Sequence, residues 1–70
     1  MRLALKFARM KKGLSQKELS NMVGINVQSV SDYETGKTNP SYQTMKKISE
    51  VLEAPVDVLF FQSEEESEVI

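Results

Sequence analysis

Residues 14–34 of the chain are LSQKELSNMVGINVQSVSDYE, and this stretch decides the fold. Ser15 followed three residues later by Glu18 is a capping-box pattern, so a helix should begin at Ser15. Gly24 stands where a residue with positive φ commonly ends a helix, and Asn26 is a favourable N-cap for the next one. The apolar stripe of the first helix consists of Leu19, Met22 and Val23. The stretch therefore predicts two short helices joined by a tight corner.

Outward from this pair, apolar spacing and capping residues predict an all-α domain of five helices and no strand. In the fourth helix the apolar positions are Tyr42, Met45, Ile48 and Leu52, and the fifth should turn Val56, Leu59 and Phe60 inward. The domain should cover residues 1–61, and the acidic residues 62–70 should be a disordered tail. The helices are expected over about residues 2–12, 15–23, 26–35, 41–53 and 55–61.

The composition excludes several classes of protein. Seventy residues make one domain with a modest core. The absence of cysteine and histidine removes disulfides, thiolate metal sites, the usual general base and the commonest metal ligand. With no glycine-rich phosphate loop either, we expect no enzyme, no cofactor, no metal and no small-molecule ligand. No apolar run is long enough to cross a bilayer, so a soluble, cytoplasmic protein is expected.

The net charge of −1 hides an asymmetry along the chain. Residues 1–47 hold all nine lysines and arginines and three acids, which gives +6, whereas residues 48–70 hold seven acids and no basic residue. Such a split is usually solvated surface charge. Here the basic part contains the helix–corner–helix stretch, whose second helix starts with small and amide side chains. This combination is typical of a helix-turn-helix that faces DNA phosphates.

The chain also resembles a known family over roughly residues 3–61. It is similar to the phage repressor and Cro type of helix-turn-helix regulator, also called the xenobiotic-response-element family. The resemblance implies a compact five-helix domain that binds double-stranded DNA as a homodimer on a near-palindromic operator. Of a repressor and an activator, both of which the sequence allows, we expect a repressor. The residues that carry it are Leu14-Ser15-Gln16-x-x-Leu19-Ser20, then Gly24-Ile25-Asn26-x-x-Ser29-Val30-Ser31-x-Tyr33-Glu34-x-Gly36-Lys37, then Pro40-Ser41-x-x-x-Met45-x-x-Ile48.

In this family the second helix of the motif lies in the major groove. The resemblance implies base contacts from Val27, Gln28, Ser29 and Asp32. Gln28 has the chemistry to pair with adenine N6 and N7, Val27 to pack on a thymine methyl group, and Asp32 to accept from cytosine N4. Ser29 could instead reach a phosphate, Asp32 could pair with a lysine, and Val27 could be a partly buried residue that touches Ile25.

Phosphate contacts are expected from the first turn of the motif and from the loop after its second helix. Gln16 matches a family glutamine that reaches a phosphate and supports the recognition helix; the alternative is an exposed residue of the capping turn. In relatives the loop after the second helix supplies backbone amides and side chains. The expected phosphate contacts are Gln16, Lys17, Asn26, Lys37, Thr38 and Asn39.

Other conspicuous residues have structural interpretations. The resemblance places Arg9 and Glu34 in a partly buried salt bridge between the first and third helices. Val58 and Phe61 are candidates for a dimer interface, with Phe7 and neighbouring Leu3 as a competing patch; Phe7 could equally pack on the C-terminal segment of its own chain. The alternative function is an antitoxin-like or regulatory protein-binding module in which DNA binding is secondary.

Overall fold

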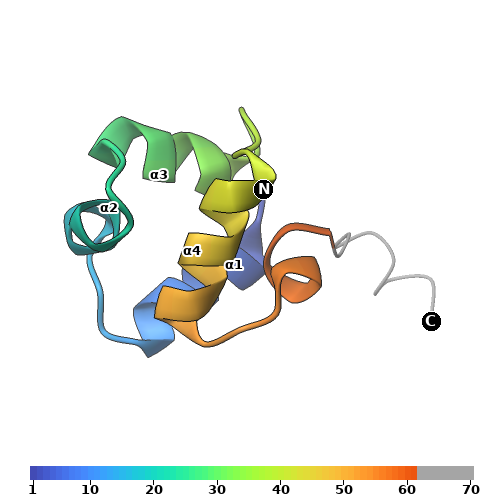
Figure 1. Cartoon of the computed structure of the whole chain (residues 1–70), viewed down its shortest axis with the longest axis horizontal. Coiled ribbons are helices and arrows are strands. Elements are labelled where there is room, and N and C mark those ends of the chain that lie inside the picture. Colours follow the sequence, from blue (N-terminus) through green and yellow to red (C-terminus); the bar gives the residue numbers. More distant parts are fainter. Residues whose placement is uncertain (62–70) are drawn as a thin grey trace.

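The computed structural model describes residues 1–61, and within them every regular element is a helix. Figure 1 shows the helices packed around one core, with α3 lying across one end of the domain beside α2. The predicted all-α, five-helix fold is confirmed. The predicted tail lies outside the described residues. The elements are α1 (Leu3–Lys11), α2 (Gln16–Val23), α3 (Val27–Thr35), α4 (Tyr42–Leu52) and a short π-helix, η1 (Asp57–Phe61).

The predicted helix starts and stops are set by local hydrogen bonds. The Ser15 hydroxyl accepts from the Glu18 amide at 3.0 Å, and the Glu18 carboxylate accepts from the Ser15 amide at 2.8 Å. The hydrogen bond from the Ser15 amide, together with the Ser15 side chain, favours the ionised carboxylate and lowers the pKa of Glu18. Gly24 ends α2 with a φ of 86°, and the Asn26 side chain caps α3 by accepting from the Ser29 amide at 2.8 Å.

The core is formed where the helices meet. α2 packs against both α3 and α4, and α1 packs against η1 and α3. The three residues expected to point inward from the fifth helix are confirmed. Leu59 and Phe60 of η1 are buried, and Val56, just before η1, packs against the core. The buried hydrophobic residues are Leu5, Leu19, Val23, Val30, Met45, Ile48, Leu52, Leu59 and Phe60.

Two residues assigned to apolar stripes are in fact exposed. Met22 is 59% exposed because the buried face of α2 consists of Leu19, Ser20 and Val23, so that Ser20 takes the place that the predicted stripe gave to Met22. Ser20 fits this buried position because its hydroxyl donates to the Lys17 carbonyl at 2.7 Å. Tyr42, the first residue of α4, is 65% exposed, and the buried face begins one turn later at Met45. The fifth helix also differs, because it begins at Asp57 and not at Pro55.

Candidate nucleic-acid interface

The outward side of α3 carries the residues expected to contact bases. Val30 and Glu34 are buried and hold the opposite side of the helix to the domain. Val27 is 44% exposed, Gln28 is exposed, and Ser29 and Asp32 are half-buried. The structure brings two of these side chains together, because the Gln28 amide nitrogen donates to the Asp32 carboxylate at 3.0 Å. The outer side of α3 therefore offers an amide, a carboxylate, a hydroxyl and a small apolar group.

A buried ionic cluster fixes α3 to the rest of the domain. Arg9 donates to both carboxylate oxygens of Glu34, from Nε at 2.5 Å and from Nη2 at 3.2 Å. Its third nitrogen donates to the Leu14 carbonyl at 2.7 Å. Glu34 is only 2% exposed, so its charge is balanced almost entirely within the protein. This cluster sets the position of α3 relative to α1.

Gln16 belongs to the same cluster. Its side-chain nitrogen donates to Glu34 at 3.1 Å, and the side chain is half-buried. The alternative that Gln16 is a simply exposed residue of the capping turn is therefore wrong. Because the nitrogen is committed to Glu34, Gln16 links the first turn of α2 to α3.

Arg2 was not singled out from the sequence, yet it fastens the end of α3. Its Nη1 donates to the carbonyls of Tyr33 at 2.7 Å and Thr38 at 3.1 Å. Its backbone amide donates to the Glu34 carbonyl at 2.7 Å, and its guanidinium lies 5.7 Å from the centroid of the Phe60 ring. Arg2 thus joins α3, the following loop and η1. Nothing in its sequence spacing indicates this role, because the partners of its side chain and of its amide are more than thirty residues away.

The loop after α3 presents side chains more than backbone amides. The amides of Lys37 and Thr38 both point to the Asp32 carbonyl, at 2.9 and 3.4 Å, and so complete the end of the helix. The expectation that this loop offers those backbone amides to phosphates is therefore wrong for these two residues. The side chains of Lys37, Thr38 and Asn39 are exposed, as is that of Lys17 on α2. Asn26 is also exposed, although its side chain is occupied as the cap of α3.

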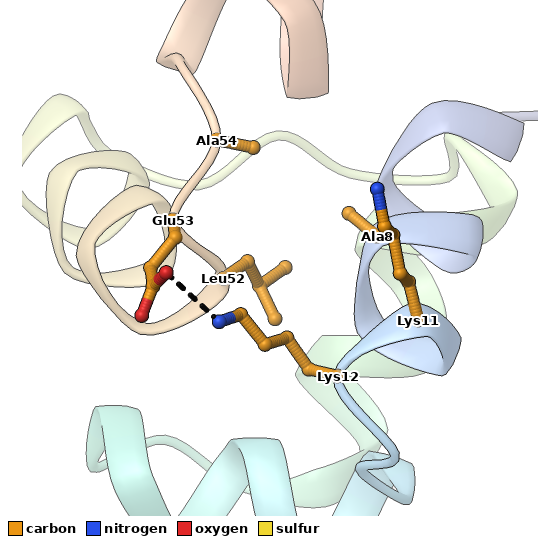
Figure 2. A pocket seen from close by; sticks show the side chains of 6 residues that line it. All are labelled: Ala8, Lys11, Lys12, Leu52, Glu53 and Ala54. Carbon is orange, nitrogen blue, oxygen red and sulfur yellow. Dashed lines mark ion pairs between the residues drawn. The ribbon is translucent and has the colours of Figure 1, made fainter.

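A pocket of about 350 Å³ lies between the C-terminal ends of α1 and α4. Figure 2 shows that the ion pair between Lys12 and Glu53, at 3.0 Å, spans part of it. Lys12 therefore has a carboxylate partner. The lining residues are Ala8, Lys11, Lys12, Leu52, Glu53 and Ala54.

Within residues 1–61, the structure groups no three acidic side chains as metal ligands would need to be. In the same part of the chain, no helix has the length and apolar character required to cross a membrane.

Comparison with known proteins points to one family. The helix-turn-helix family model matches residues 5–59. Two uncharacterized HTH-type transcriptional regulators of Archaeoglobus fulgidus are each 36% identical over 66 residues, which cover 94% of this chain and 94% and 93% of theirs. The SPbeta prophage-derived regulator YonR of Bacillus subtilis, also described as an uncharacterized HTH-type transcriptional regulator, is 38% identical over 55 residues. That match covers 79% of this chain and 51% of YonR.

Proposed function

The chain belongs to the phage repressor and Cro type of helix-turn-helix transcriptional regulators, a DNA-binding family, and from this premise we propose that it represses transcription as a homodimer on a near-palindromic operator. The observation that carries the proposal is the fixed position of α3. The buried Arg9–Glu34 pair holds one side of this helix while Gln28 and Val27 remain exposed on the other. A recognition helix needs this rigidity to place side chains against base edges.

In this proposal the contacts divide into two kinds. Val27, Gln28 and Ser29 face the bases, and Asp32 lies beside them on the same helix. The exposed side chains of Lys17, Lys37, Thr38 and Asn39 reach phosphates. At the helix starts, Gln16 and Asn26 add contacts through the side-chain N–H groups that their bonds to Glu34 and to the Ser29 amide leave free. The phosphate contacts set the position of the domain, and the α3 contacts set the sequence that it selects.

Selection of bound sequences from random duplex DNA tests the proposal. The wild-type chain should enrich a near-palindromic sequence with half-site centres about 34 Å apart. Gln28→Ala should lower affinity for that operator by about 10-fold or more, since a good bidentate base contact discriminates by roughly 1–3 kcal/mol. Gln43→Ala, at an exposed position of α4, is the control and should bind as wild type does. Failure of the wild-type chain to enrich any sequence would overturn the proposal.

The dimer is proposed to form through the exposed aromatic residues of α1 and η1. Phe7 and Phe61 are 57% and 63% exposed within the described chain, and Val58 is half-buried beside Phe61. The two patches that the sequence offered as competitors lie on elements that pack against each other. A dimer is favoured because one small domain buries too little surface on DNA for operator-level affinity.

Phe61→Glu should therefore convert the dimer to a monomer and weaken operator binding without unfolding the domain, because the charged side chain would have to be buried in the interface. Sedimentation equilibrium gives the mass, and circular dichroism checks the fold. Tyr42→Glu is the matched control, because Tyr42 is an equally exposed aromatic residue on α4. A wild-type chain that stays monomeric at high micromolar concentration, with and without DNA, would contradict the dimer.

A further inference from the structure

We infer that Asp32 fixes the direction in which Gln28 presents its side-chain amide, and thereby makes the recognition helix distinguish an A·T pair from the inverted T·A pair. This inference rests on the proposed DNA binding. It assigns Asp32 a positioning role in place of the base contact expected from the sequence.

The inference begins with the bond between the two side chains. Gln28 and Asp32 are one turn apart on α3, and Gln28 Nε2 donates to Asp32 Oδ1 at 3.0 Å. An ionised carboxylate only accepts hydrogen bonds, so it can face the nitrogen end of the amide and not the oxygen end. The partner's chemistry therefore determines the direction of the Gln28 amide.

The backbone of Asp32 is anchored at the end of α3, and its side chain is less exposed than that of Gln28. Its side chain is half-buried, and its backbone carbonyl accepts from the amides of Lys37 and Thr38 and from the Thr35 hydroxyl at 3.2 Å. Gln28, by contrast, is exposed at the start of the helix. The half-buried carboxylate thus limits the directions open to the exposed amide, which lowers the loss of side-chain entropy when Gln28 meets a base.

The oriented amide still has the groups needed to read adenine. One N–H of Gln28 is used by Asp32, while the second N–H and the carbonyl oxygen remain for adenine N7 and N6. Across the major groove, N7 and N6 of an A·T pair occur in the opposite order from those of a T·A pair. An amide of fixed direction therefore matches one order, whereas an amide that can turn over could match either.

The test compares Asp32→Asn with wild type on two operators. An asparagine offers both an oxygen and an NH2 group, so it can bond Gln28 in either direction. The first operator is the sequence that the wild-type chain selects. Gln28→Ala identifies the base pair that Gln28 reads, because the preference at that position is lost in this variant. The second operator is a copy of the first in which this base pair is inverted in both half-sites. Glu50→Gln controls for the change in charge, since Glu50 is an exposed acid on α4.

Wild type and Glu50→Gln should prefer the selected operator over the inverted one by about 10-fold or more, and Asp32→Asn by less than about 3-fold. In the Gln28→Ala background, Asp32→Asn should change this ratio no further, because its effect passes through Gln28. If Asp32→Asn preferred the selected operator over the inverted one as strongly as wild type does, the inference would be overturned. An equal effect of Asp32→Asn with and without Gln28 would overturn it as well.

A measurement without DNA separates this inference from the proposed function. Nitrogen-15 relaxation of the Gln28 side-chain amide should show greater mobility in Asp32→Asn than in wild type or Glu50→Gln. Equal mobility in all three would overturn the inference while leaving the proposed function intact. A wild-type chain that selects no DNA would overturn the proposed function and the base-reading role of Asp32, whatever the relaxation shows.

Discussion

Arg9→Ala is expected to lower the free energy of unfolding by about 3–5 kcal/mol, because it leaves a buried carboxylate without its cation. Glu34 is 2% exposed, and among residues 1–61 its carboxylate accepts two hydrogen bonds from Arg9 and one from Gln16. The Leu14 carbonyl would lose its guanidinium partner as well. Small domains are stable by only about 0.05–0.15 kcal/mol per residue, so a loss of this size removes much of the stability of the domain. Urea denaturation followed by circular dichroism measures it.

The chain contains a natural control for this substitution. Lys12 and Glu53 form an ion pair of 3.0 Å, but their side chains are 35% and 74% exposed. Lys12→Ala should therefore change the free energy of unfolding by no more than about 1 kcal/mol, as expected for a solvent-exposed pair. If Arg9→Ala proved as stable as Lys12→Ala, the buried pair would not hold α3 in place. DNA binding by Arg9→Ala is informative only at temperatures at which the variant is still folded.

The parts of the fold that the sequence predicted are those determined by neighbouring residues. The capping box at Ser15, the glycine after α2 and the Asn26 cap involve residues no more than five positions apart, and their hydrogen bonds occur as expected. Such local signals specify where helices begin and end, and through them the number and order of the helices. They also placed Gln28 and Asp32 on the same helix.

The rest depended on contacts between elements. Met22 fits the spacing of an apolar stripe, but the packing of α2 against α3 and α4 turns that helix toward Ser20, which leaves Met22 exposed. Arg2 acquires its partners only when the start of the chain meets the end of α3. Gln28 and Asp32 have the spacing for a hydrogen bond with each other, but each side chain could equally bind a base. The sequence therefore did not predict the bond between them. Sequence spacing identifies which residues share a face of a helix. Tertiary packing determines which of these residues are buried and which partners they bind.

Raising the salt concentration from about 50 to 200 mM is expected to weaken operator binding by about 10⁴-fold. If the two protomers together neutralise about eight phosphates, log K falls against log salt with a slope near −7, because each neutralised phosphate contributes about −0.9. The net charge of −1 does not oppose this, since residues 1–47 carry +6 and include α3 and its loop. Fluorescence anisotropy over a salt series measures the slope, and a slope near zero would contradict DNA binding altogether.

The effect of replacing a single lysine on the salt slope should depend on where that lysine lies in the structure. Lys17→Ala and Lys37→Ala should each make the slope shallower by about 2 in a dimer, because each removes one exposed cation per protomer from the proposed phosphate contacts. Lys12→Ala should leave the slope unchanged, since Lys12 is already paired with Glu53 at the pocket between α1 and α4. All three substitutions remove the same charge, so net charge alone would predict three equal changes. Unequal changes in the stated order would show that position relative to α3, and not total charge, determines which cations replace the counterions of DNA.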